Sequence, residues 1–109
     1  MDKKRKIVRL SNSEIPEILR KPILLYNYEE VKSTVDNLSP LGIGLAVDKN
    51  APIRVGDFFY LKYYGIESDI KCLCVYSEVD GEIRNIGAYF TEPEDQKIIM
   101  THLFIQYEN

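Results

Sequence analysis

Most of the chain alternates large apolar residues with small or polar ones, the two-residue period of strands that bury one face. The segment 41–48 shows the pattern most clearly, because four bulky apolar residues alternate there with Gly42, Gly44 and Ala46. One face of this strand is therefore nearly bare, which lets a ligand or another backbone approach closely. The same alternation, or a high content of β-branched and aromatic residues, predicts six strands in all, at 22–28, 29–37, 41–48, 57–64, 69–79 and 82–90.

Turn signals indicate that neighbouring strands run antiparallel. Asp80-Gly81 separates the last two predicted strands and is the strongest hairpin signal in the sequence. A short helix is predicted before the strands, over 13–19, with Ser13 as its cap.

A longer helix is predicted at the end of the chain, over 93–107. Thr91 and Glu94 have the spacing of a capping box, and Pro93 is tolerated in a first helical turn. Apolar residues recur at three- and four-residue spacings along this segment, at Ile99, Met100, Leu103, Phe104 and Tyr107. Short strands followed by one helix favour an all-β fold with a C-terminal helix, a small six- or seven-stranded antiparallel β-barrel whose open end the helix covers.

Length and charge limit the function classes. The 109 residues are expected to form one domain, with a flexible basic arm at 1–9, a barrel at 22–90 and the helix at 93–107. The net charge is −3, but the first nine residues hold five Lys or Arg and one Asp, a net charge of +4, so the remaining 100 residues carry −7. An acidic body argues against broad nucleic-acid binding, because phosphates require a basic surface.

The sequence also favours a cytoplasmic location. No apolar run reaches the roughly 20 residues of a membrane span, and no apolar signal-peptide stretch follows the basic start. We therefore expect a cytoplasmic protein that does not insert into a membrane.

Residue types that catalyse reactions or bind metals are few. Cys72 and Cys74 lie two apart in a predicted strand, so they share a face and are expected to be buried as small hydrophobes. His102 is the single histidine, and no group of His, Cys and carboxylates has metal-ligand spacing. We therefore expect neither catalysis nor a metal or cofactor.

Three short motifs follow one another in the sequence. The segment 5–9 is RKIVR, 37–42 is NLSPLG, and 51–63 is APIRVGDFFYLKY, which leads through Gly-Asp into an aromatic strand. In this order, and with the late hairpin and the last helix, the motifs resemble those of a PilZ domain, the bacterial receptor module for cyclic di-GMP. The resemblance covers most of the chain, from about Ile23 to the C-terminus, together with the arginine pair.

The resemblance implies a ligand site. Arg5 and Arg9 would fold over cyclic di-GMP, because a guanidinium binds phosphate and the guanine O6 and N7 atoms and also stacks on bases. Asn37 and Ser39 would contact the ligand from the barrel surface, and Gly42 would leave room for it. The resemblance further implies a sensor that acts through a protein partner, in motility, pilus or biofilm control.

Two departures from the family pattern leave alternatives open. Asn37 replaces the more common aspartate, which lowers the number of acceptors for guanine N–H groups. Arg9 lies 28 residues before Asn37, whereas Arg20 lies 17 before it and has Pro16 at the partner position. If Arg20 holds the clamping position, the arginine pair is broken and the chain resembles PilZ-type interaction modules that bind no nucleotide.

A third alternative is an unrelated small barrel that binds single-stranded nucleic acid. Stacking of bases would then involve Tyr60, Tyr63 and Tyr64 in the aromatic strand. The acidic body counts against this alternative.

Overall fold

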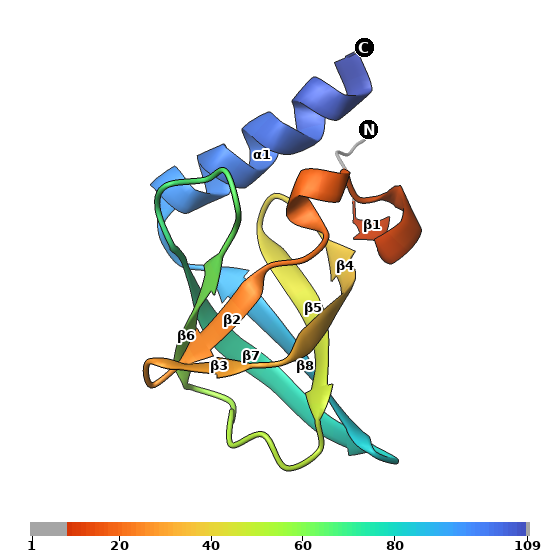
Figure 1. Ribbon diagram of the computed structural model, residues 1–109, viewed down its shortest axis with the longest axis vertical. Helices are drawn as coiled ribbons and strands as arrows, with labels where there is room; N and C mark the ends of the chain where they lie inside the picture. Colours follow the sequence, from red (N-terminus) through yellow and green to blue (C-terminus); the bar gives the residue numbers. More distant parts are fainter. Residues whose placement is uncertain (1–8, 109) are drawn as a thin grey trace, which may run out of the picture.

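A computed structural model describes the backbone of residues 9–108 and the side chains of residues 9–103 (Figure 1). The elements in chain order are β1 (Leu10–Ser11), η1 (Asn12–Glu14), η2 (Glu17–Leu19), β2 (Ile23–Tyr26), β3 (Glu29–Val31), β4 (Ser33–Leu38), β5 (Gly42–Asp48), β6 (Phe58–Lys62), β7 (Ile70–Asp80), β8 (Ile83–Phe90) and α1 (Pro93–Glu108). Of the predicted basic arm, only Arg9 is among the described residues. Within residues 9–108, no helix has both the length and the hydropathy that a membrane span requires.

The strands form one antiparallel sheet in the order β1-β4-β5-β8-β7-β6-β2-β3. A single residue, Lys32, separates β3 at one edge of the sheet from β4, the second strand from the other edge. The sheet must therefore curl on itself, and Figure 1 shows the resulting barrel-like shape with α1 lying across one end.

The predicted antiparallel barrel with a C-terminal helix is confirmed. The described residues form eight strands rather than six or seven, for two reasons. The predicted strand 29–37 is divided at Lys32 into β3 and β4, and two residues before η1 form the additional strand β1. Leu10 and Ser11 in β1 pair with Leu38 and Asn37 in β4.

The core lies inside the curled sheet and under α1. The bulky residues of β5 point inward, as their alternation predicts, and Phe59 of β6 and Phe90 of β8 are fully buried beside them. Ile99 and Leu103 of α1 join the same core. Removing this apolar surface from water is the main driving force for the fold. Gly44 and Ala46 on the other face of β5 are only partly buried, whereas Gly42 is buried.

The predicted last hairpin and the predicted first helix had different outcomes. The last hairpin exists, but β7 ends at Asp80 and β8 begins at Ile83, so its turn is Gly81-Glu82. Gly81 has a φ of +68°, a conformation that glycine adopts without steric cost. The predicted helix over 13–19 is wrong, because Pro16 separates two 3₁₀ turns there.

The start of α1 also differs in detail from the prediction. Pro93 occupies the first helical position as expected, so Glu92 rather than Thr91 precedes the helix. The Thr91 hydroxyl donates to the Glu92 carboxylate at 3.4 Å, and the Gln96 amide donates to the Phe90 carbonyl at 2.7 Å. The predicted capping box at Thr91 is therefore wrong, although the helix itself is confirmed.

Asp57 of the Gly-Asp pair before β6 connects the end of β2 to the loop between β5 and β6. One carboxylate oxygen of Asp57 accepts hydrogen bonds from the Tyr26 hydroxyl at 2.8 Å and from the Arg54 amide at 2.9 Å. The same hydrogen bond from Tyr26 raises the pKa of the Tyr26 hydroxyl. Gly56 has a φ of +96°, which explains the glycine before Asp57.

Candidate ligand-binding site

The NLSPLG motif forms the connection between β4 and β5. Ser39 is 0% exposed, and its hydroxyl oxygen accepts hydrogen bonds from the Gly42 amide at 3.2 Å and the Leu41 amide at 3.3 Å. The Ser39 amide in turn donates to the Gly42 carbonyl at 2.9 Å. The serine therefore satisfies backbone donors that the tight turn would otherwise leave unpaired.

The two glycines of β5 are required for different reasons. A Cβ atom on Gly42 would lie 2.4 Å from the carbonyl oxygen of Ala88, which is backbone of the neighbouring strand β8. A Cβ atom on Gly44 would instead lie 2.7 Å from the side-chain nitrogen of Asn37. Gly42 thus permits the close approach of two strands, whereas Gly44 makes room for the Asn37 side chain on the outer face.

Strand register places Asn37, Gly44, Gly87 and Tyr76 in one row across four adjacent strands. Asn37 of β4 pairs with Gly44 of β5, Gly44 pairs with Gly87 of β8, and Gly87 pairs with Tyr76 of β7. The two glycines form a bare floor between an amide on one side and an aromatic ring on the other.

A hollow of about 240 Å³ lies over this floor, and we call it the glycine trough. Its lining includes Arg9, Asp36, Asn37, Gly44, Val75, Tyr76, Asn85, Gly87 and Tyr89. The trough therefore brings together hydrogen-bond donors, acceptors and aromatic rings above exposed backbone. Such a combination suits a flat, polar ligand better than an apolar one.

Arg9 reaches the trough because β1 is anchored beside β4. Leu10 is buried and pairs with Leu38, so the preceding residue lies next to the end of β4. A guanidinium nitrogen of Arg9, Nη1, donates to the side-chain oxygen of Asn37. The arginine thus lines the trough beside Asn37.

Tyr76 forms the opposite wall. Its side chain is 49% exposed, and its hydroxyl donates to the Glu78 carboxylate. This hydrogen bond raises the pKa of the Tyr76 hydroxyl, so the phenol stays neutral well into the alkaline range. The exposed ring is therefore held at one end while its face remains open.

The structure brings together part of the predicted site. Arg9 and Asn37 are in direct contact, and Gly42 and Ser39 lie in the turn beside them but within the fold. Ligand contact by Ser39 stays a prediction. Arg5 lies outside the described residues, so its position in the site also stays a prediction.

Arg20 belongs to a different part of the molecule. It follows η2, and its Nη2 donates to the Ile15 carbonyl at 2.7 Å. It is not among the residues that line the trough. The geometry therefore favours Arg9 over Arg20 as the arginine that belongs with Asn37.

Sequence reasoning missed Gly87, Tyr76 and the continuation of the floor into β8. A signal was available, because NIGAYF in 85–90 puts Gly87 between Asn85 and Tyr89 on one face of a predicted strand. Its pairing with Gly44, however, depends on the strand register, which the sequence did not specify.

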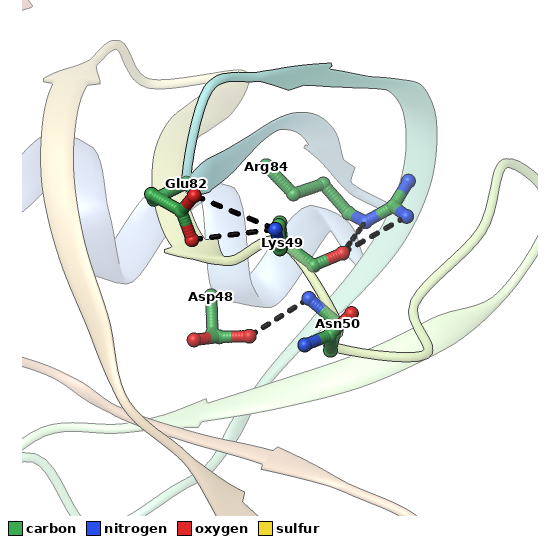
Figure 2. A network of polar contacts seen from close by, with 5 residues as sticks. All are labelled: Asp48, Lys49, Asn50, Glu82 and Arg84. Atoms are coloured by element: carbon green, nitrogen blue, oxygen red, sulfur yellow. Dashed lines mark hydrogen bonds and ion pairs between the residues drawn. The ribbon is translucent and has the colours of Figure 1, made fainter.

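A second polar cluster lies near the β7–β8 hairpin, at the end of the barrel away from α1 (Figures 1 and 2). Arg84 donates to the Lys49 carbonyl from Nε at 3.3 Å and from Nη2 at 3.2 Å, and to the Ser77 hydroxyl at 2.9 Å. Lys49 forms an ion pair with Glu82 at 3.4 Å. These contacts connect the loop after β5 to the hairpin.

The cysteines and the histidine that the sequence offered for catalysis or metal binding lie among groups of the fold. Cys72 and Cys74 are buried as predicted, and burial raises the pKa of both thiols. His102 Nδ1 lies 2.9 Å from the Ile98 carbonyl, within α1. Among residues 9–108, no three His, Cys, Asp or Glu residues gather as metal ligands would.

The aromatic strand does not form the stacking surface of the nucleic-acid alternative. Tyr63 is 2% exposed, so its ring is part of the core, whereas Tyr64 is 97% exposed and Tyr60 is partly exposed. The three rings are therefore not available together for stacking on successive bases.

Comparison with known proteins identifies the fold. No family model matches the chain, and no curated protein matches it. The structure of the inhibitor of motility MotI/DgrA from Bacillus subtilis matches with a TM-score of 0.66 and 16% identity, over 97% of this chain and 52% of that one. The PilZ domain of YcgR from Escherichia coli, solved with c-di-GMP, matches with a TM-score of 0.58 and 16% identity, over 93% of this chain and 89% of that one.

These likenesses establish a PilZ-type fold for the described residues. The chain spans about half the length of the Bacillus protein it matches. At 16% identity the comparison concerns the fold, and the ligand of the Escherichia coli domain is a property of that domain.

Proposed function

We propose that the chain is a cytoplasmic receptor domain that binds cyclic di-GMP and passes the level of this second messenger to a protein partner. The observation that carries the proposal is the contact of Arg9 with Asn37 at the rim of the glycine trough. It joins the arginine motif and the NLSPLG motif, which lie 28 residues apart in the sequence, in one place on a PilZ-type fold.

The ligand's chemistry fits the groups around the trough. Cyclic di-GMP has two phosphates and two guanines, and a guanidinium binds either group through paired, charge-assisted hydrogen bonds. Arg9 is exposed and donates to a neutral side chain, so it can exchange this contact for a ligand at low cost. Arg5 would add a second guanidinium from the basic arm.

The proposed role is sensing rather than catalysis. The buried thiols of Cys72 and Cys74 have raised pKa values, which disfavours the reactive thiolate. A domain of this kind acts by changing how a partner binds, and the motility inhibitor among its structural neighbours makes motility the first process to examine. Pilus and biofilm control are the other processes that the motifs suggested.

One observation favours a second candidate function, a PilZ-type interaction module that binds no cyclic di-GMP. The side-chain oxygen of Asn37 accepts from Arg9, and the Ser39 hydroxyl is used within its turn. Two of the motif's polar groups therefore have partners inside the chain, as a purely structural motif requires.

Isothermal titration calorimetry distinguishes the two functions. The chain is titrated with cyclic di-GMP and with cyclic di-AMP, which has the same two phosphates but no guanine. The proposal predicts saturable binding of cyclic di-GMP and weaker binding of cyclic di-AMP. Arg9→Ala is expected to weaken binding by about 10- to 100-fold, since it removes charge-assisted hydrogen bonds.

Arg20→Ala is the matched control, because it removes the same group from a position outside the trough. Its circular dichroism spectrum must match that of the unsubstituted chain, and its affinity is expected to be unchanged. If Arg20→Ala abolishes binding while Arg9→Ala has no effect, the site is misplaced. If the unsubstituted chain produces no binding heat at millimolar cyclic di-GMP, the interaction module replaces the receptor.

A further inference from the structure

Tyr76 and Gly87 complete the trough, yet neither belongs to the motifs on which the proposed function rests. We propose that Tyr76 stacks on one purine ring of the ligand, which occupies the hollow between the Tyr76 and Asn37 side chains. This inference rests on the proposed function, because it assigns a base-binding subsite within the same trough.

A β-bulge aims Tyr76 at the floor. The register of β7 against β8 shifts between Cys74 and Tyr76, so the alternation of the strand changes there. Before the bulge Cys72 and Cys74 point into the core, and after it Tyr76 and Glu78 point out of the barrel. Without the shift, residue 76 would continue the inward series of the two cysteines. Bulges of this kind re-aim side chains next to functional sites.

The floor is flat because both of its residues lack a side chain. A Cβ atom on Gly87 would lie 3.4 Å from the Tyr76 Cβ and 3.9 Å from its Cδ2, so the tyrosine follows the floor at van der Waals distance. A Cβ atom on Gly44 would meet the Asn37 amide from the other side. Asn37 and Tyr76 therefore lean over the two glycines, and a planar group would occupy the hollow that lies between their side chains.

The position of the Tyr76 ring is restrained while its face stays open. The hydroxyl donates to Glu78, two residues along the same strand face, and the side chain is half exposed. A restrained ring loses little conformational entropy when a base stacks on it. Stacking also removes apolar ring surface from water, which the fold itself leaves exposed.

The opposite wall selects a base over other planar groups. Arg9 offers guanidinium donors to the edge of a ring in the trough, and a guanidinium pairs with the O6 and N7 atoms of guanine, while the Asn37 amide supplies one further donor group. An aromatic face on one side and edge-directed donors on the other constitute a site for a nucleobase.

Calorimetry with cyclic di-GMP on three tyrosine variants tests the inference. Tyr76→Ala is expected to bind roughly 5- to 150-fold more weakly, the range for loss of one base–aromatic stack. Tyr76→Phe keeps the ring and is expected to keep most of the affinity, although it loses the hydroxyl contact with Glu78. Tyr60→Ala removes a ring of similar exposure from β6, outside the trough, and is expected to bind like the unsubstituted chain.

Proton NMR supplies a readout that a merely structural role would not affect. Stacking predicts that the Tyr76 ring protons and the guanine H8 shift upfield on binding, and that the H8 shift is lost in Tyr76→Ala. If Tyr76→Ala binds cyclic di-GMP as tightly as the unsubstituted chain, and the guanine H8 shifts by the same amount in both, the inference is overturned and the proposed function stands. If the unsubstituted chain does not bind cyclic di-GMP at all, the proposed function fails, and the inference with it.

Discussion

The guanidinium groups of Arg9 and Arg84 have different hydrogen-bond partners. Arg84 donates to the carbonyl of Lys49 and the hydroxyl of Ser77, so its donors connect a loop to a hairpin (Figure 2). Arg9 is exposed and donates to the side chain of Asn37 at the rim of a trough. The Arg84 donors are committed to a carbonyl and a hydroxyl of the fold, whereas an exposed arginine that donates to one side chain has donors left for a ligand.

The same contrast separates the remaining polar groups of the two regions. Near Arg84, the ion pair of Lys49 with Glu82 is largely exposed, so it contributes little to stability. The Arg84 hydrogen bonds and the backbone amide of Asn50, which donates to the Asp48 carboxylate, are the shorter polar contacts there. Around Arg9, the ring of Tyr76 is half exposed and the two glycines have no side chain to pack, so fewer contacts of the fold depend on this region.

The largest expected effect separates the two glycines of β5. Gly42→Ala places a Cβ against the Ala88 carbonyl and is expected to lower the free energy of unfolding by about 3 kcal/mol, because backbone must move. Gly44→Ala meets only the Asn37 side chain, which can rotate, so stability changes little while cyclic di-GMP affinity falls. Urea denaturation and calorimetry on both variants measure this, and equal destabilisation by both would contradict it.

The next effect tests the two arginines directly. Arg84→Met keeps the aliphatic volume but removes three hydrogen bonds from a charged group, so the free energy of unfolding is expected to fall by about 1.5–3 kcal/mol. Arg9→Met, the matched change at the trough, is expected to stay within about 0.5 kcal/mol. For cyclic di-GMP affinity we expect the reverse, a larger loss in Arg9→Met than in Arg84→Met. A large loss of stability in Arg9→Met would contradict the difference drawn between the two arginines.

A smaller effect is expected at the turn between β4 and β5. Ser39→Ala leaves the amides of Leu41 and Gly42 without their acceptor, which is expected to lower the free energy of unfolding by about 1–2 kcal/mol. Thermal denaturation followed by circular dichroism measures the loss. Should the variant keep full stability but lose ligand affinity, Ser39 would belong to the binding site rather than to the fold.

The smallest effect concerns the contact between the arginine and the amide. Asn37→Asp turns the hydrogen bond from Arg9 into an exposed ion pair, expected to add about 0.2–1 kcal/mol at low ionic strength. Salt should screen this gain, so urea denaturation at low and high ionic strength gives the test. A gain that does not depend on salt would show that the new carboxylate has another partner.

The sequence predicted the fold because its strongest patterns are local. Alternation in β5, the Gly81 turn and the C-terminal helix each depend on neighbouring residues, and all three are present, with Ile99 and Leu103 of the predicted apolar stripe buried. Element limits were less accurate. The division at Lys32 goes with the curling of the sheet, which is a property of the whole barrel, and Pro16 divides the segment 13–19 into two 3₁₀ turns.

The candidate site was predicted on one side only. Arg9 and Asn37 belong to motifs that can be recognised within a few residues, whereas the Tyr76 wall depends on a bulge in β7 and on pairing across three strands. The choice between Arg9 and Arg20 was likewise open in the sequence, since it depends on the pairing of β1 with β4. Long-range register is the information that a single sequence lacked.

The most direct test of the account is an amide chemical-shift map of the nitrogen-labelled chain titrated with cyclic di-GMP. Binding at the trough predicts the largest shifts at Gly44, Gly87 and their neighbours on the outer face, and small shifts at Arg84 and Ser77. Shifts concentrated around Arg84, or a spectrum that does not change at millimolar ligand, would contradict the central claim that the glycine trough is the binding site.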